Sequence, residues 1–192
     1  MTRTKEFDEE IVLQKAMKLF WEQGYEKTSI NDLVEHMGIH RRSLYDTFGD
    51  KHKLYLMTVD RYGKRINSAL SASMQRSTSR QAVQFIFDMA VEGLGEESPP
   101  GCMFVNMAVE LAPRDLEAEA KACESFSSAE QHLAGIIRQG QQNGEFTSVQ
   151  SAEELAESLH NALLGLRVLS RTSTSKEKLY RIAKLSMEIL DK

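Results

Sequence analysis

The stretch that most constrains the fold is residues 28–54, TSINDLVEHMGIHRRSLYDTFGDKHKL. Ser29 and Asp32 have the spacing of a capping box, which marks the start of a helix. The apolar residues that follow repeat at helical spacing, and Gly38 is the residue type that ends a helix in a left-handed turn. A second short helix comes next. The pattern therefore predicts a helix-turn-helix motif over about 29–48, whose second helix has the size and position to enter a DNA major groove.

The order of residues in this stretch resembles the DNA-binding domain of the TetR family of bacterial transcriptional regulators. The resemblance is carried by T-S-I-x-D-L-V-x-x-M-G-I-x-R-x-S-L-Y-D-T-F-G-D-K and covers about residues 6–66. Two positions depart from it, because His40 stands where many members have a small capping residue and Arg42 where many have glycine. The resemblance implies a three-helix DNA-binding domain over 6–66 and a C-terminal effector-binding and dimerisation domain over 67–192.

The remainder of the chain also has the apolar periodicity of helices, and no convincing strand pattern is present. We therefore expect an all-α fold of about nine helices. The Ser-rich run 68–80 is expected to separate two of them, and residues 101–112 are apolar nearly all round, which predicts a buried helix. The expected helices are 8–23, 29–37, 40–48, 50–73, 79–94, 101–112, 115–142 and two more that begin at about Ser151 and Ser175.

Charge and cysteine content limit the functional classes. The chain of 192 residues has a formal net charge of −4, and residues 1–65 contribute +1 from 12 Lys and Arg against 11 Asp and Glu, so the remainder carries −5. This distribution excludes an indiscriminate nucleic-acid binder and suits a small basic face on an acidic body. Two cysteines make no disulfide framework, and neither a secretory signal nor a membrane span is recognisable, so we expect a cytoplasmic protein without a membrane partner.

Catalytic and metal-binding motifs are not found. The sequence has no Gly-rich phosphate loop, no HExxH, no CxxC and no serine nucleophile elbow. The five histidines fall on separate expected helices. We therefore expect no enzyme activity, no cofactor and no metal.

The expected DNA contacts divide by chemistry. Arg41 and Arg42 are the predicted base readers, because a guanidinium can bond both acceptors of guanine, although adjacent arginines on a short helix can also be a merely solvated face. Ser43 and His40 can reach a base edge or a phosphate. The hydroxyls and backbone amides at the start of the first helix of the motif suit a phosphate, and the resemblance implies further phosphate contacts. The complete predicted set is Thr28, Ser29, His40, Arg41, Arg42, Ser43, Tyr45 and Lys51.

The resemblance also implies a small-molecule effector bound within the C-terminal helices. Such a pocket needs apolar walls and a few polar groups, and the nine methionines suit adaptable walls, although methionine also simply fills cores. The predicted lining is Phe85, Met89, Cys102, Met103, Asn106, Met107, Phe126, His132, His160 and Arg167. Cys102 has a second interpretation as an oxidant or electrophile sensor, since it stands at an expected helix N-terminus, against the simpler one of a small buried residue.

The last two helices have broad apolar stripes. In the family this pair joins its copy across a two-fold axis into a four-helix bundle, whereas the alternative is packing within one subunit. Two-fold dimers also solve the problem that one recognition helix reads few base pairs. The predicted interface is Leu155, Leu159, Ala162, Leu163, Leu166, Leu169, Leu179 and Ile182.

Together these features predict a homodimeric transcriptional regulator, in the first instance a repressor that a small-molecule effector releases from a palindromic double-stranded DNA operator. One alternative replaces the effector by oxidation or alkylation of Cys102. An alternative of another class is a helical ligand-binding or scaffold protein without DNA binding.

Overall fold

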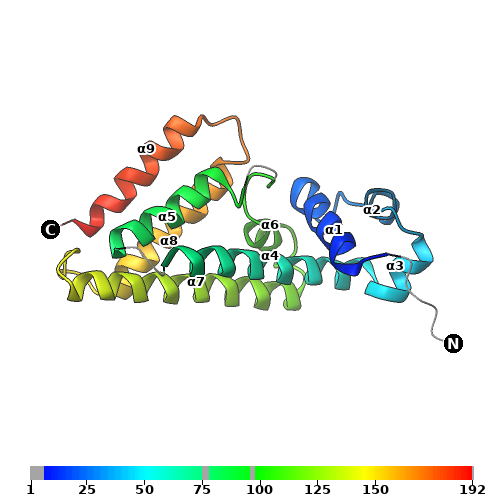
Figure 1. The fold of residues 1–192 in the computed structure, drawn as a ribbon, viewed down its shortest axis with the longest axis horizontal. Coiled ribbons are helices and arrows are strands. Elements are labelled where there is room, and N and C mark those ends of the chain that lie inside the picture. Colours follow the sequence, from blue (N-terminus) through cyan, green and yellow to red (C-terminus); the bar gives the residue numbers. More distant parts are fainter. Residues whose placement is uncertain (1–6, 75–77, 96–97, 192) are drawn as a thin grey trace.

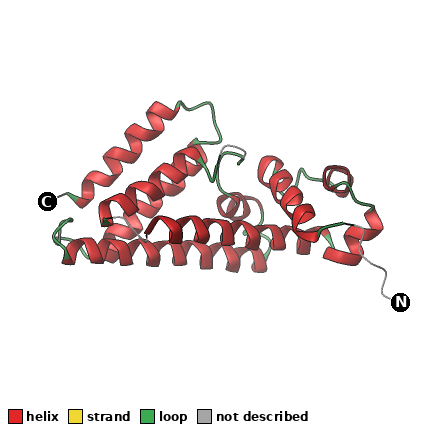
Figure 2. Cartoon of the chain, viewed as in Figure 1, coloured by secondary structure: helices red, strands yellow, loops and turns green. Residues whose placement is uncertain are grey.

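The computed structural model describes residues 7–74, 78–95 and 98–191, and all regular structure within these ranges is helical (Figure 2). This confirms the all-α prediction. The described part of the chain contains nine α-helices and one short 3₁₀ helix. Their bounds are α1 Glu9–Gln23, α2 Ile30–Met37, α3 Arg41–Phe48, α4 Lys51–Met74, α5 Ser79–Glu92, α6 Met103–Glu110, α7 Leu116–Gln142, α8 Ala152–Leu169, α9 Lys176–Met187 and η1 Glu188–Leu190.

The helices are arranged along one long axis (Figure 1). Helices α1, α2 and α3 form a head at one end of the molecule, and α5, α8 and α9 lie at the other end. Helix α4 starts in the head and continues into the body, where Lys121 of α7 forms an ion pair of 2.5 Å with Asp60. The helix that follows the helix-turn-helix motif is therefore also a wall of the body.

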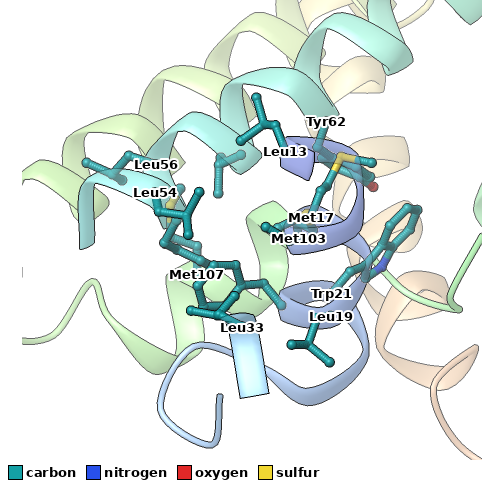
Figure 3. Packing of buried hydrophobic residues seen from close by; sticks show 14 of the residues in the cluster. Leu13, Met17, Leu19, Trp21, Leu33, Leu54, Leu56, Tyr62, Met103 and Met107 are labelled. Carbon is teal, nitrogen blue, oxygen red and sulfur yellow. The ribbon is translucent and has the colours of Figure 1, made fainter. Parts of the chain in front are cut away.

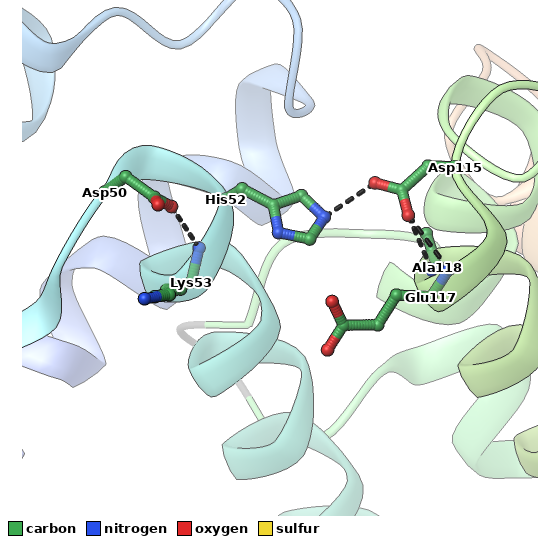
Figure 4. A network of polar contacts seen from close by, with 6 residues as sticks. All are labelled: Asp50, His52, Lys53, Asp115, Glu117 and Ala118. Atoms are coloured by element: carbon green, nitrogen blue, oxygen red, sulfur yellow. Dashed lines mark hydrogen bonds and ion pairs between the residues drawn. The ribbon is translucent and has the colours of Figure 1, made fainter.

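The helix ends in the head follow the predicted signals. Ser29 and Asp32 form a reciprocal capping box at the start of α2. Gly38 has a left-handed conformation with φ of 72°, and its N–H donates to carbonyl oxygens of the last turn of α2. Asp50 caps α4, since its Oδ1 accepts from the N–H of Lys53 at 2.8 Å (Figure 4). These local contacts define the two ends of α2 and the start of α4.

One hydrophobic cluster joins the head to the body (Figure 3). Trp21 of α1 packs edge-on against Tyr62 of α4, with ring centroids 4.7 Å apart, and the ring of Phe104 of α6 also lies 5.5 Å from that of Tyr62. Met103 and Met107 of α6 are buried in the same cluster. The head therefore does not have a core separate from α6, and the expected boundary at residues 66 and 67 falls inside α4.

The Ser-rich run 68–80 was expected to separate two helices, and this is confirmed, because α4 extends to Met74 and α5 begins at Ser79. Another expectation needs correction. Residues 101–112 were expected to be buried all round, but Val109 is 73% exposed and only Met103 and Met107 are buried within α6. Most of the other side chains of α6 are half-buried, because this short helix packs between the head and the other helices of the body.

Candidate nucleic-acid interface and ligand cavity

Helix α3 presents its basic side chains to solvent. Arg41 and Arg42 are exposed, and among the described residues Arg42 pairs with Asp46 one turn on, with Nε and Oδ2 3.5 Å apart. An exposed ion pair of this kind contributes about 0.2–1 kcal/mol, so a stronger DNA partner can replace it. The guanidinium of Arg41 lies 5.9 Å from the ring centre of Tyr45. His40 is the N-cap of α3 and its side chain makes no capping bond.

The two hydroxyls at the start of α2 have different environments. Thr28 is fully buried and its Oγ1 donates to the carbonyl oxygen of Gly24 at 2.6 Å. Its hydroxyl is therefore already used within the protein, and the predicted phosphate contact of Thr28 stays a prediction. Ser29 is exposed; its Oγ accepts from the N–H of Asp32 at 3.1 Å, which leaves the hydroxyl proton available as a donor. The N–H of Ser29 is not free, because the Asp32 carboxylate accepts from it at 2.8 Å.

Lys51 and Ser43 flank this surface. The ammonium of Lys51 lies 4.3 Å from the ring centre of Tyr25, at the first residue of α4. Burial lowers the pKa of Lys51 from its ordinary 10.5, and the carboxylate of Glu26 opposes this effect. Ser43 is half-buried on α3. Both side chains remain candidates for DNA contact.

A cavity of about 590 Å³ lies in the body between α4, α5, α6, α7 and α8. It has the size of a site for a drug-sized molecule. Five of the ten predicted residues line it, namely Met89, Phe126, His132, His160 and Arg167. The remaining lining is Asp60, Gly63, Lys64, Ile66, Asn67, Leu70, Ile86, Phe104, Lys121, Glu124, Ser125, Ser128, Ala129, Leu133 and Leu163.

The other five predicted pocket residues lie elsewhere. Cys102, Met103 and Met107 are buried in the cluster around α1, and Phe85 is an exposed residue of α5. Asn106 does not line the cavity, although its Nδ2 is buried and has no partner among the described residues. The prediction missed the wall supplied by α4, because the apolar periodicity of that helix was attributed to the link between the two domains.

Two histidines that line the cavity each have a buried Nε2 atom. His160 is 2% exposed, its Nδ1 lies 3.0 Å from Oε1 of Glu130, and its Nε2 has no hydrogen-bond partner in the part of the chain that the structure describes. Burial lowers the pKa of His160 below its ordinary 6.5; the hydrogen bond to Glu130 opposes this effect and the charge of Arg167 adds to it. The Nε2 of His132 is also buried and unpartnered.

Cys102 is the N-cap of α6, but its side chain is 1% exposed and packs in the core. A buried thiol of this kind is not accessible to an oxidant or electrophile without movement of the core. Cys123 is exposed on α7. The geometry therefore favours the simpler interpretation of Cys102 as a packing residue.

The predicted interface residues fall into two groups. The first group is buried inside the subunit, where these side chains pack against their own chain: Leu155, Leu159, Leu163, Leu166 and Leu179. Ala162, Leu169 and Ile182 are partly buried. Next to them, Val168 of α8 is 50% exposed and Leu185 of α9 is 60% exposed. The most apolar positions of both helices fill the core, and a second apolar set remains outside.

Among the described residues, several polar links join the head to the body. Oε2 of Glu110 accepts from the N–H of Tyr25 at 2.7 Å and of Glu26 at 3.2 Å. Arg171, which follows α8, donates to the carbonyl oxygens of Trp21 at 2.8 Å and Glu22 at 3.2 Å. We use the term head–body junction for the bonds of Glu110, the bonds of Arg171 and the contact between His52 and Asp115 that is described next.

The third link joins the starts of α4 and α7 (Figure 4). Nε2 of His52 lies 2.6 Å from Oδ2 of Asp115, the N-cap of α7. The other oxygen of Asp115 accepts from the N–H groups of Glu117 and Ala118, both at 3.0 Å. These contacts lower the pKa of Asp115 from its ordinary 3.8, with the Ala118 bond as the largest cause and the His52 bond contributing.

Over residues 7–74, 78–95 and 98–191 we find no group of three or more histidine, cysteine, aspartate or glutamate side chains placed to hold a metal ion. In the same ranges no helix is long and apolar enough to cross a membrane.

Family models match both parts of the chain. Residues 12–57 match the model of bacterial regulatory proteins of the tetR family. Residues 68–185 match the model of a tetracyclin repressor-like C-terminal domain. The second match alone covers more than half of the chain.

Relatives and solved structures agree with these matches. An uncharacterised HTH-type transcriptional regulator of Bacillus subtilis, YezE, is 34% identical over the full length of both chains. The HTH-type transcriptional repressor ComR of Escherichia coli is 30% identical over 97% of this chain and 90% of its own. Among solved structures, a cysteine-substituted form of the regulator CifR, in complex with 26-base-pair operator DNA, has a TM-score of 0.86. It shares 25% identity over 98% of this chain and 99% of its own.

Proposed function

The chain belongs to the TetR family of bacterial transcriptional regulators, and on this premise we propose that it is a homodimeric repressor that an effector releases from its operator. Its relatives are regulators of transcription, and the chain is not an enzyme. The observation that carries the proposal is the exposed basic face of α3 on a fold that matches an operator-bound regulator over nearly its whole length.

In this proposal α3 enters the major groove. Arg41 and Arg42 read base edges, because each guanidinium can leave its weak partner on α3 for the two acceptors of guanine. Ser29, Tyr45 and Lys51 bind phosphates on either side and fix the register of the helix. Since the rest of the chain is acidic, this contact is limited to the head.

We place the dimer interface on the outer face of α8 and α9. Helix α9 buries Leu179, Ala183 and Met187 at successive turns against the body, whereas Leu185 and Ile189 remain exposed. Val168 extends this face on α8, where Gly165 has open space in front of it. Closing this face against a copy gives two-fold symmetry, which suits paired half-sites about one helical turn apart.

The head–body junction couples the cavity to the head. Arg167 lines the cavity, and Arg171, one turn further along the chain, holds the last carbonyl groups of α1. A ligand that shifts this end of α8 therefore also displaces α1 through the hydrogen bonds of Arg171. This displacement changes the distance between the two heads of the dimer. By linkage, the ligand and the operator must weaken each other's binding by the same factor.

A gel-shift titration tests the proposal. Wild-type protein is titrated against duplexes that cover the DNA upstream of its own gene, with Arg41→Ala and Arg42→Ala as variants and Arg138→Ala, an exposed arginine of α7, as the control. We expect binding by wild type and control, and weaker binding by both α3 variants. If the wild-type protein binds no upstream duplex more tightly than it binds random DNA, the proposal that it regulates from this upstream DNA is wrong.

A further inference from the structure

The cavity in the body has a polar pattern that specifies a ligand class, which deepens the proposed function and rests on it. His160, Leu163 and Arg167 line the cavity from one face of α8, at spacings of three and four residues. His160 and Arg167 are two helical turns apart, roughly 10 Å along the axis. Two polar groups therefore face the same cavity from points separated by the length of a small aromatic molecule.

The first group is the imidazole of His160. A carboxylate such as Glu130 only accepts hydrogen bonds, so the contact of 3.0 Å puts the proton on Nδ1. In the neutral ring Nε2 then carries a lone pair, and this atom is buried with no partner among the described residues. An unsatisfied buried acceptor costs free energy until a donor arrives. The matching ligand group is a hydroxyl.

The second group is the guanidinium of Arg167. Among the described residues we find no carboxylate paired with it, in contrast to Lys121, which lines the same cavity and is bonded to Asp60. Arg167 is half-buried, and its charge is close enough to His160 to influence that ring. A guanidinium binds a planar carboxylate through two parallel hydrogen bonds. The matching ligand group is a carboxylate.

The walls between these groups are apolar and partly aromatic. Phe104 and Phe126 line the cavity, and the ring of Phe126 lies 5.7 Å from that of His160. Two carboxylates, Asp60 and Glu124, also belong to the lining; Asp60 is neutralised by Lys121 and Glu124 is exposed on α7. These carboxylates make a cationic ligand the competing possibility.

We propose that the effector is an amphipathic carboxylic acid that carries a hydroxyl at its far end, of the size and shape of a phenolic acid. Arg167 binds the carboxylate, Nε2 of His160 accepts from the hydroxyl, and the aromatic walls cover the ring. In this arrangement the ligand satisfies the buried acceptor and the unpaired cation at the same time.

Four probes separate the groups: p-coumarate has both the acid and the hydroxyl, cinnamate lacks the hydroxyl, p-coumaramide lacks the charge, and tyramine replaces the acid by an amine. Binding to the full-length protein is measured by isothermal titration calorimetry. We expect p-coumarate to bind about ten-fold more tightly than cinnamate or p-coumaramide, the ratio for loss of one hydrogen bond to a buried group. Tyramine is expected to bind most weakly.

Variants then assign each preference to its residue. Arg167→Gln is expected to remove the preference for the acid over the amide, whereas the control Arg138→Gln keeps it. His160→Phe is expected to remove the preference for p-coumarate over cinnamate, and its retained binding of cinnamate shows that the variant is folded. Equal binding of p-coumarate and cinnamate by wild type, tighter binding of tyramine, or no binding of any probe overturns the inference.

The failure of the inference and that of the proposed function are distinguishable. If p-coumarate binds as described but leaves operator affinity unchanged, the ligand class stands and the proposed regulation is wrong. If the operator is bound and no acid binds the cavity, the regulator stands and the ligand class is wrong.

Discussion

Removal of the Glu110 carboxylate gives the sharpest prediction for the head–body junction. In Glu110→Ala, the N–H groups of Tyr25 and Glu26 lose an acceptor that lies 2.7 Å and 3.2 Å away. A hydrogen bond to a charged group contributes about 1.5–3 kcal/mol. The second bond is long and both groups are partly open to solvent, so we expect a total loss of about 2 kcal/mol.

The assay is thermal unfolding combined with amide hydrogen exchange. For a chain of this size a loss of about 2 kcal/mol lowers the melting temperature by about 4–8 °C. The amides of Tyr25 and Glu26 should also exchange faster, because the variant opens the corner between α1 and α2. Glu119→Ala, which removes an exposed carboxylate of α7, is the matched control and should change neither. Unchanged melting and exchange in Glu110→Ala would refute the reasoning.

Three further changes test other parts of the structure. Leu185→Asp puts a charge on the proposed interface and should shift sedimentation from dimer to monomer, whereas Val149→Asp at an exposed loop position should not; a dimeric Leu185→Asp contradicts the interface. Gly24→Ala should destabilise the protein by more than about 1 kcal/mol in urea unfolding, because φ is +87° and the new Cβ would meet Oε1 of Glu110; near-wild-type stability would be inconsistent with this geometry. The pKa of Asp115 is lower in the folded state than its ordinary 3.8, so its stabilisation is present above that value and is lost as the pH falls through the folded-state pKa. The free energy of unfolding of wild type should therefore fall between about pH 5 and about pH 3, and the fall should be smaller in Asp115→Asn. An equal fall in both proteins would show that other carboxylates cause it.

Local signals in the sequence predict the helix ends well, because capping depends on residues three or four positions apart. Ser29 with Asp32, Gly38 and Asp50 each act where the pattern indicates. The burial of a hydroxyl is not a local property. Thr28 looks like a surface residue at a helix start, but its hydroxyl is directed to the carbonyl of Gly24.

Apolar periodicity identifies that a helix has a buried face but not what covers it. On α8, Leu159 and Leu163 were predicted to face a second copy and instead fill the core of their own subunit. The face that remains for a partner contains Val168 and its exposed neighbours. This face has fewer apolar residues than the face that is buried in the core. The cavity shows the same limit, because its α4 wall depends on how far that helix runs beside α7, which no residue pattern within α4 specifies.

The partner of a buried polar group is also a tertiary property. His160 was predicted in the cavity by its place on α8, but its role depends on Glu130, thirty residues earlier on α7. The sequence therefore predicts the residue, whereas the orientation of the ring and its free Nε2 follow only from the packing of the two helices.

The most direct test of the account is selection of bound duplexes from a random DNA library by the wild-type protein, followed by fluorescence anisotropy on the enriched site. We expect an inverted repeat whose half-sites are about one helical turn apart, and a loss of about 1–3 kcal/mol in binding for Arg42→Ala on that site. Enrichment of no motif, or equal binding by wild type and Arg42→Ala, would contradict sequence-specific recognition by α3.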